Sequence, residues 1–222
     1  MRKKAVLAWS GGKDCALALC KLQEDGEYDV VSLLTTITAG YDRVSMHGVR
    51  SNLLERQADS IGINIQRVTI PKECSNEEYD VRMRDAMESL RKKRIEAIAF
   101  GDIFLENVRR YREERLSDSG MDILFPLWKQ DTALLARKFI DLGFRAVITC
   151  VDTDKLSRSF AGKEFDLAFL SALPSTVDQC GENGEFHTFV YDGPIFRKRI
   201  DFDRGDVVLR DNRFCFCDLV PR

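Results

Sequence analysis

The sequence lacks a large excess of charge, a long apolar run and a Cys-x-x-Cys pair. Its 34 basic and 36 acidic residues give a formal charge of −2, so we expect no broad nucleic-acid-binding surface. No apolar run approaches membrane-spanning length, and residues 1–4 lead directly into the first expected strand, so we expect neither a membrane span nor a cleavable signal peptide. The seven cysteines are scattered, which disfavours a structural zinc site and favours reduced thiols in a cytoplasm.

The chain has the composition of an ordinary globular protein. Its 222 residues are 44% hydrophobic and 32% charged, which suffices for one large domain or two modest ones. Short apolar runs typical of buried strands alternate with helical patterns in the first 128 residues. The expected strands are residues 5–9, 30–37, 63–70, 97–100 and 123–125. This alternation predicts an α/β fold with a doubly wound, five-stranded parallel sheet and right-handed crossovers.

The pattern changes after Trp128. Asp131 can cap a helix, a further strand is expected at residues 145–151, and another helix should stop at Pro174. The last 45 residues alternate in a manner typical of strands, with a turn at Asp211-Asn212. We therefore expect a first domain over residues 1–128 and a smaller α+β domain over residues 129–222, packed together without a flexible linker.

A glycine turn, Ser10-Gly11-Gly12-Lys13-Asp14-Cys15, joins the first expected strand to the first expected helix. Glycines allow a tight turn and let a ligand approach the backbone closely. The free amides and the positive dipole end of the helix favour an anion. Lys13 adds a positive charge, and Asp14 is a candidate ligand for Mg²⁺ accompanying a phosphate chain. The spacing does not fit the Walker pattern. The turn predicts a nucleotide-phosphate site, with an ordinary glycine turn as the alternative.

Further candidate ligands follow other strands. The fourth strand runs into Gly101-Asp102, and the intensely charged segment 106–115 comes next. The carboxyl ends of parallel strands meet at one edge, where ligands of open α/β sheets bind, so we assign Gly101 and Asp102 to the nucleotide. The charged helix can instead simply solvate a surface, and His47 is either a ligand or a plain polar contact. The residues assigned to substrate binding are His47, Arg110, Tyr111, Glu114 and Arg115.

A third cluster precedes an expected strand near the C-terminus. Glu182 and Glu185 bracket an Asn-Gly pair, and His187 follows. On an extended strand Glu185 and His187 would face the same side. Carboxylates beside an imidazole can hold a metal, orient an amine or move a proton. The alternative is a polar hairpin turn in which Asn-Gly serves only the backbone dihedrals.

Together these segments resemble the diphthine–ammonia ligase (diphthamide synthetase) family of N-type ATP pyrophosphatases. The resemblance spans almost the whole chain and rests on the glycine turn and on residues 110–115, 125–128, 181–188 and 190–194. It implies a nucleotide-binding HUP domain that uses ATP and Mg²⁺, and an amidation that releases AMP and pyrophosphate. In that reaction a carboxylate on a modified histidine of elongation factor 2 is adenylated and then attacked by ammonia. The residues it implies for catalysis are Lys13, Asp14, Glu182, Glu185 and His187.

The sequence departs from the family pattern at three positions. Cys15 stands where a serine is usual, Asn183 where a glycine is usual, and His187 where a third glutamate is usual. Segments 74–77 and 186–189 resemble a bacterial branch of the family. Bacteria lack diphthamide, so the acceptor there would be an unknown substrate, and the nitrogen donor ammonia or another amine.

Two other functions remain open. One is a PP-loop tRNA-modifying enzyme, although members that transfer sulfur tend to need a cysteine pair and a basic RNA surface, which this chain lacks. The other is a sensor that binds ATP or AMP without turnover, which has less need of converging charges such as Lys13, Asp14, Glu182 and Glu185. The oligomeric state is also open, with a homodimer as one option.

Overall fold

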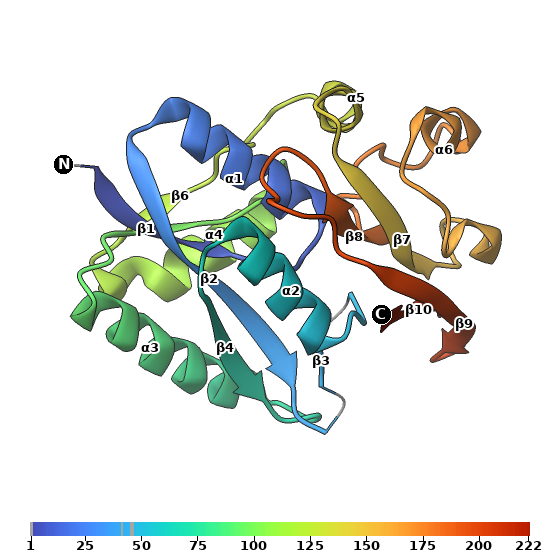
Figure 1. Ribbon diagram of the computed structural model, residues 1–222. Coiled ribbons are helices and arrows are strands. Elements are labelled where there is room, and N and C mark those ends of the chain that lie inside the picture. Colours follow the sequence, from blue (N-terminus) through green and yellow to red (C-terminus); the bar gives the residue numbers. More distant parts are fainter. Residues whose placement is uncertain (1, 41, 45–46) are drawn as a thin grey trace.

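The structure, a computed structural model, describes residues 2–40, 42–44 and 47–222. Within these residues the first sheet has six strands, namely β1 (Lys3–Ala8), β2 (Tyr28–Thr38), β3 (Arg43–Val44), β4 (Ile65–Ile70), β5 (Ala97–Ala99) and β6 (Asp122–Leu124). Five of them are parallel and lie in the order β4-β2-β1-β5-β6 (Figure 1). This confirms the doubly wound parallel sheet. The two-residue β3, which pairs antiparallel with the end of β2, was not predicted.

The order of the strands identifies where a ligand should bind. The chain winds outward from β1 through β2 to β4, and then returns to the other side of β1 with β5 and β6. The winding therefore reverses between β1 and β5. In open α/β sheets, ligands bind outside the carboxyl ends of the strands at such a reversal. The glycine turn follows β1 and Gly101 follows β5, so both lie at this point.

Helices bury both faces of the first sheet. They are α1 (Lys13–Asp25), α2 (Ser51–Ile61), α3 (Asn76–Lys92) and α4 (Glu106–Leu116), followed by the 3-10 turn η1 (Ser117–Ser119). Successive residues of β1 point to opposite faces, so Ala5 and Leu7 join the core beneath α1 and α2, while Val6 joins the core beneath α3. Burial on both sides explains why β1 is a continuous apolar run.

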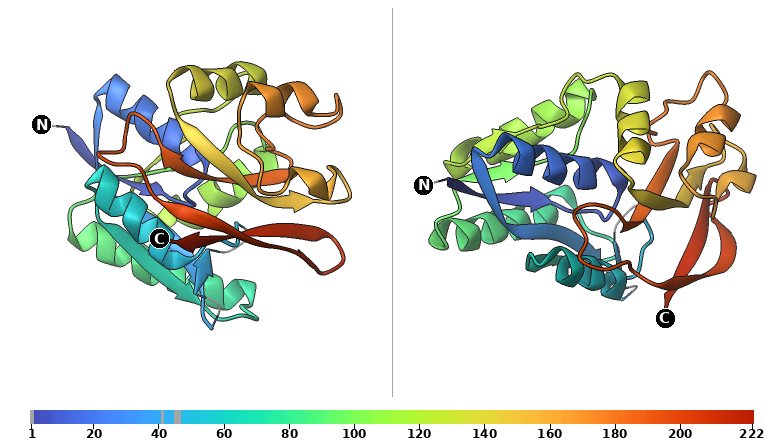
Figure 2. Two further views of the ribbon diagram at one scale, coloured as in Figure 1. Left: turned by 45° about the vertical axis from the view of Figure 1, so that its right-hand side comes forward. Right: turned by 45° about the horizontal axis from the view of Figure 1, so that its top comes forward.

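A second, antiparallel sheet follows. It contains β7 (Arg145–Asp152), β8 (Phe186–Asp192), β9 (Phe202–Arg210) and β10 (Phe214–Pro221) in the order β8-β7-β10-β9. Its helical segments are α5 (Thr132–Asp141), η2 (Arg158–Phe160) and α6 (Leu167–Ala172). Figure 2 shows this sheet lying beside the carboxyl ends of β1 and β2. The two parts are packed together, because one buried cluster includes Leu17 of α1 together with Phe186 and Phe189 of β8. A domain boundary at residue 128 stays a prediction.

The ends of the helices follow the expected capping chemistry. The Ser75 hydroxyl accepts a hydrogen bond from the amide of Glu78, and the Asp131 carboxylate accepts one from the amide of Leu134. Gly62 ends α2 in the left-handed region, at φ 83°. None of the helices within the described residues is long and apolar enough to cross a membrane.

Candidate functional site

A cavity of about 490 Å³ lies at the carboxyl ends of β1 and β5, where the second sheet covers the first. From the first part of the chain, the predicted residues that line it are Ser10, Lys13, Asp14, Cys15, His47, Gly101 and Asp102. From the second part they are Glu182 and His187. The fold therefore brings together residues that are far apart in the sequence. A volume of this size lies within the usual range for small-molecule sites.

The backbone of the glycine turn is held by Gln57 of α2, which sequence analysis missed. Its fully buried amide group donates to the carbonyl oxygens of Gly11, at 3.0 Å, and Val190, at 2.5 Å. Its oxygen accepts a hydrogen bond from Trp9 Nε1 at 2.9 Å. A polar side chain on the apolar face that contains Leu54 and Ala58 is a sequence signal that could have identified this contact.

Close approaches explain two of the glycines. A Cβ atom on Gly101 would lie 2.9 Å from the carbonyl carbon of Asp14, closer than real Cβ atoms come to backbone. A Cβ atom on Gly12 would lie 3.1 Å from His47 Cε1 and 3.2 Å from the carbonyl oxygen of Thr188. These glycines let β5, α1 and β8 meet around the turn. Any side chain here would also restrict the approach of a ligand to the backbone.

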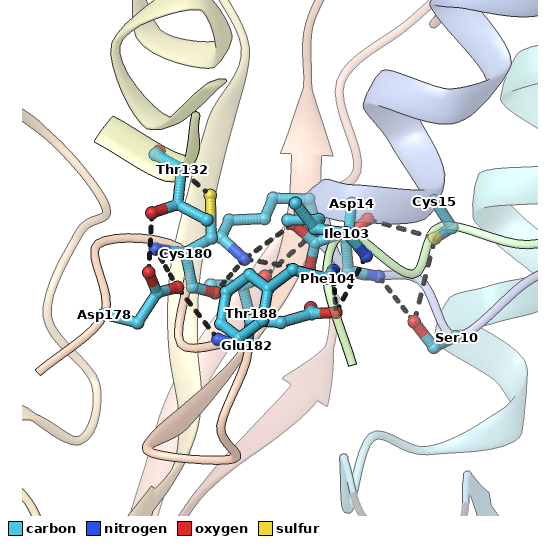
Figure 3. A network of polar contacts seen from close by, with 12 residues as sticks. Ser10, Asp14, Cys15, Ile103, Phe104, Thr132, Asp178, Cys180, Glu182 and Thr188 are labelled. Atoms are coloured by element: carbon cyan, nitrogen blue, oxygen red, sulfur yellow. Dashed lines mark hydrogen bonds and ion pairs between the residues drawn. The ribbon is translucent and has the colours of Figure 1, made fainter. Parts of the chain in front are cut away.

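Two amides of the turn donate to neutral hydroxyls. The amide of Gly12 donates to Ser10 Oγ at 3.3 Å, and the amide of Lys13 donates to Thr188 Oγ1 at 3.0 Å (Figure 3). Hydrogen bonds to charged oxygens are roughly twice as strong as those between neutral groups. Phosphate oxygens are therefore better acceptors for these amides than the hydroxyls that now face them.

Lys13 lies between the two parts of the chain. Its ammonium donates to both carboxylate oxygens of Asp14 at 2.8 Å and to the carbonyl oxygen of Cys180. The side chain is almost fully buried and lies over the rings of Phe165 and Phe186. Burial alone would lower the pKa of Lys13, but the combined attraction of Asp14, Cys180 and Glu182 outweighs burial and raises that pKa. The ammonium is thus charged and held by protein oxygens, and its contact with phosphate stays a prediction.

Glu182 is the acid–base group best placed in the cavity. Its Oε1 accepts hydrogen bonds from the amides of Ile103, at 2.7 Å, and Phe104, at 3.4 Å, just beyond β5 (Figure 3). Burial, with the nearby charge of Asp14, raises the pKa of Glu182 to about 7. Its carboxyl group can therefore exchange a proton near neutral pH.

Glu185 lies elsewhere than the sequence predicted. It is almost fully buried, and its Oε1 accepts hydrogen bonds from the amide of Asp178 and from Asn183 Nδ2, both at 3.1 Å. It is not among the described residues that line the cavity. The backbone of Glu185 still pairs with β7, through the amide of Asp152, but its carboxyl group is held by the loop residues Asp178 and Asn183. Its contacts indicate that it organises the turn that carries Glu182.

Helix α4 presents a different arginine from those predicted. Arg110 is exposed, lies 4.0 Å from Glu114 and is not among the described residues that line the cavity. Instead, Arg112 lines it, pairs with Asp102 at 2.7 Å and lies 4.2 Å from the centre of the Phe100 ring. The helix has charges on all sides, so its sequence gave no apolar stripe from which to tell its inner face.

The other predicted residues of α4 line an adjoining cavity. Tyr111, Glu114 and Arg115 belong to a cavity of about 620 Å³ between α3 and α4. The residues that line both cavities are Tyr79, Met83, Phe100 and Arg112. The two spaces are therefore neighbours.

Cys15 is not an acidified thiol. Its Sγ donates to the carbonyl oxygen of Gly12 at 3.0 Å, and burial raises the pKa of Cys15 to about 11. Since the thiolate is the reactive form, this thiol is poorly suited to nucleophilic chemistry at neutral pH. Cys15 therefore serves the turn as a weak hydrogen-bond donor.

The glycine turn follows the first strand of a doubly wound sheet and lies beside a cavity that holds a glutamate of raised pKa. These features are typical of an α/β enzyme with a PP-loop type nucleotide site. The chain belongs to the diphthamide synthase family. The model of the diphthamide synthase N-terminal domain matches residues 2–122, and that of the diphthamide synthase C-terminal domain matches residues 131–218.

Curated relatives agree with this family. The chain is 27% identical to a diphthine–ammonia ligase of Danio rerio over 91% of this chain and 88% of that protein. It is 28% identical to that of Homo sapiens over 94% of this chain and 85% of that protein. The family match and these relatives together show that the chain is an ATP-dependent, amide-forming ligase.

The likeness to solved structures is weaker. A predicted subunit of tRNA methyltransferase from Methanocaldococcus jannaschii superposes with a TM-score of 0.41 and 17% identity, over 70% of this chain and 80% of that chain. This similarity is too distant to support a functional conclusion.

Proposed function

We propose that the chain transfers AMP from ATP to a carboxylate acceptor and that ammonia, or another amine, then displaces AMP to form an amide. In the first step a carboxylate oxygen bonds to the α-phosphorus and pyrophosphate leaves. In the second step the amine nitrogen bonds to the acyl carbon, AMP leaves with the bridging oxygen, and the nitrogen loses a proton to a base. The observation that carries this proposal is Glu182, whose pKa is about 7, in the same cavity as the glycine turn.

The glycine turn is the proposed site of the triphosphate. Amides of residues 10–13, at the positive end of α1, suit phosphate oxygens. Within the described residues no group of three or more acidic, His or Cys side chains is placed to hold a metal ion. Mg²⁺ in nucleotide sites usually needs only one or two carboxylates besides the phosphates. Asp14, whose side chain is 29% exposed in a cavity that Asp102 also lines, fits that requirement. Mg²⁺ would supply neutralisation of the phosphate charge.

Glu182 is the proposed base for the amine half of the reaction. Ammonia is mostly protonated at neutral pH, and ammonium cannot attack an acyl carbon. A carboxylate with a pKa of about 7 can remove that proton, and it also attracts the cation to the cavity. Asp14, which lines the same cavity, adds negative charge there.

The acceptor is proposed to enter through the adjoining cavity between α3 and α4. Tyr111, Glu114 and Arg115 line this space, and Arg112 lines both cavities. The named relatives are diphthine–ammonia ligases, so elongation factor 2 carrying diphthine is the first acceptor to test. An unidentified carboxylate is the alternative.

Incubation with ATP labelled at the α-phosphorus tests the reaction type. We expect labelled AMP to form when acceptor and ammonium are both supplied, with pyrophosphate as the other product of ATP. Formation of ADP and phosphate would contradict the proposal, and binding of ATP without any turnover would favour a sensor. Glu106→Gln, which replaces a side chain that is 75% exposed, is the matched control for the Glu182→Gln variant discussed below.

A further inference from the structure

We propose that His47 and His187 together form a site for the terminal phosphates of the nucleotide, and that this imidazole pair takes up a proton when the phosphates bind. The inference rests on the proposed nucleotide site and adds to it two side chains whose protonation is coupled to phosphate binding. The chain has only two histidines. They come from the segment between β3 and α2 and from β8, and their rings meet with centroids 4.5 Å apart.

The pair lies against the glycine turn. A Cβ atom on Gly12 would lie 3.1 Å from His47 Cε1 and 3.3 Å from Ser10 Oγ. The imidazole of His47 therefore packs beside the backbone whose amides form the anion site. His47 Nδ1 lies 3.4 Å from the carbonyl oxygen of Thr188, and both histidines line the cavity of about 490 Å³. Phosphate groups on the amides of Gly12 and Lys13 would thus reach these rings.

Both imidazoles are neutral without a ligand. Burial, together with the positive charge of Lys13 on α1, lowers the pKa of His187 to about 4. Burial also lowers the pKa of His47 well below its ordinary value, and repulsion by His187 and Lys13 adds to this effect. Among the contacts of the described residues, neither ring is hydrogen-bonded to a carboxylate.

The other charged groups around the cavity are already engaged. Asp14 of α1 pairs with Lys13, and Asp102 after β5 pairs with Arg112 of α4. Glu182, before β8, accepts from two backbone amides. Glu182, whose pKa is about 7, can also gain a proton when an anion binds in the cavity. A variant that lacks both histidines but keeps Glu182 therefore shows which of these groups takes up the proton.

A triphosphate reverses the balance that keeps the pair neutral. Nearby negative charge favours the protonated imidazole, whose two N–H groups can both donate. Because the rings are in contact, two charges would repel, so one proton per pair is expected. By linkage, a ligand that raises a pKa binds more tightly as the pH falls toward that raised pKa. ATP affinity should therefore increase between pH 8 and about pH 6, whereas AMP, which lacks the terminal phosphates, should show little change.

Calorimetry of an ATP analogue with a methylene bridge between the α- and β-phosphorus tests this inference without turnover. Titrations at about pH 6.5 in buffers of different ionisation enthalpy give the number of protons exchanged. We expect the protein to take up close to one proton per analogue bound, after subtraction of the protonation of the analogue itself, and almost none with AMP. The double variant His47→Gln/His187→Asn should lose this uptake and bind the analogue about tenfold more weakly, as for a lost charge-assisted hydrogen bond.

The outcomes separate this inference from the proposed function. Binding of the analogue by the unmodified protein without proton uptake would overturn the inference and leave the nucleotide site intact. Retention of the full uptake by the folded double variant would overturn it as well. If the analogue does not bind at all, the nucleotide site itself is refuted, and the inference with it. The measurement on the unmodified protein decides the matter even if the double variant fails to fold.

Discussion

Glu182→Gln is expected to lower the rate of amide formation by roughly 10²–10⁴, the usual effect of losing an acid–base group, while ATP affinity stays nearly unchanged. The amide side chain can still accept hydrogen bonds from the amides of Ile103 and Phe104, as the carboxylate does. It cannot accept a proton from ammonium. The loss should therefore appear in turnover with saturating ATP and acceptor.

The pH dependence gives this prediction its second readout. Since the pKa of Glu182 is about 7, the carboxylate forms as the pH rises through neutrality, and the rate of the unmodified enzyme should rise over the same range. The rate of the unmodified enzyme should level off above neutral pH, once the carboxylate has formed. The rate of the variant should instead keep following the fraction of free ammonia, so that a high ammonia concentration at high pH partly restores it. Glu106→Gln, the exposed control, should keep both the rate and the pH profile of the unmodified enzyme. A Glu182→Gln enzyme with full amide-forming activity would exclude Glu182 as the base.

Lys13→Met should lower the free energy of unfolding by about 3 kcal/mol, at the low end of the range for breaking a buried ion pair. Methionine keeps an unbranched side chain against Phe165 and Phe186 but leaves Asp14 without its cation. The low end is appropriate because the Asp14 side chain is 29% exposed. The carbonyl oxygen of Cys180 also loses its donor. Urea unfolding followed by circular dichroism measures this change.

A double variant separates the ion pair from packing. Lys13→Met/Asp14→Asn removes both charges, so part of the lost stability should return. We expect either variant with Lys13→Met to bind ATP about 1.5–3 kcal/mol more weakly if the ammonium also contacts phosphate. Unchanged stability in Lys13→Met would show that the buried ammonium does not fasten the two parts of the chain together.

Most of the fold could be predicted from the sequence because its signals are local. Residues 5–9 identify a strand because they form an apolar run, and the glycines that follow identify a turn because their backbone is free to adopt it. Ser75 and Gly62 likewise mark helix ends through side-chain capping and positive φ. Strand β3 was not predicted because two residues are too few to show the alternation of apolar and polar side chains that marks a strand.

The site was less predictable because side-chain direction depends on tertiary contacts. The sequence predicted that Glu185 and His187 face the same side, but contacts with Asp178 and Asn183 hold the Glu185 carboxyl group in the preceding loop. It favoured Arg110, although Arg112 is the arginine that pairs with Asp102. Sequence reasoning identified Lys13 as a charge near the turn but did not predict that the carbonyl oxygen of Cys180 accepts its hydrogen bond.

The transfer of ¹⁸O from the acceptor to AMP tests the acyl-adenylate route most directly. The acceptor carboxylate is labelled with ¹⁸O, and the reaction is run with ATP, Mg²⁺ and ammonium until amide has formed. Because the acceptor oxygen bonds to the α-phosphorus and leaves with AMP, mass spectrometry should find one ¹⁸O atom in each AMP released. Amide formation accompanied by unlabelled AMP, or by ADP and labelled phosphate, would contradict adenylation of the acceptor.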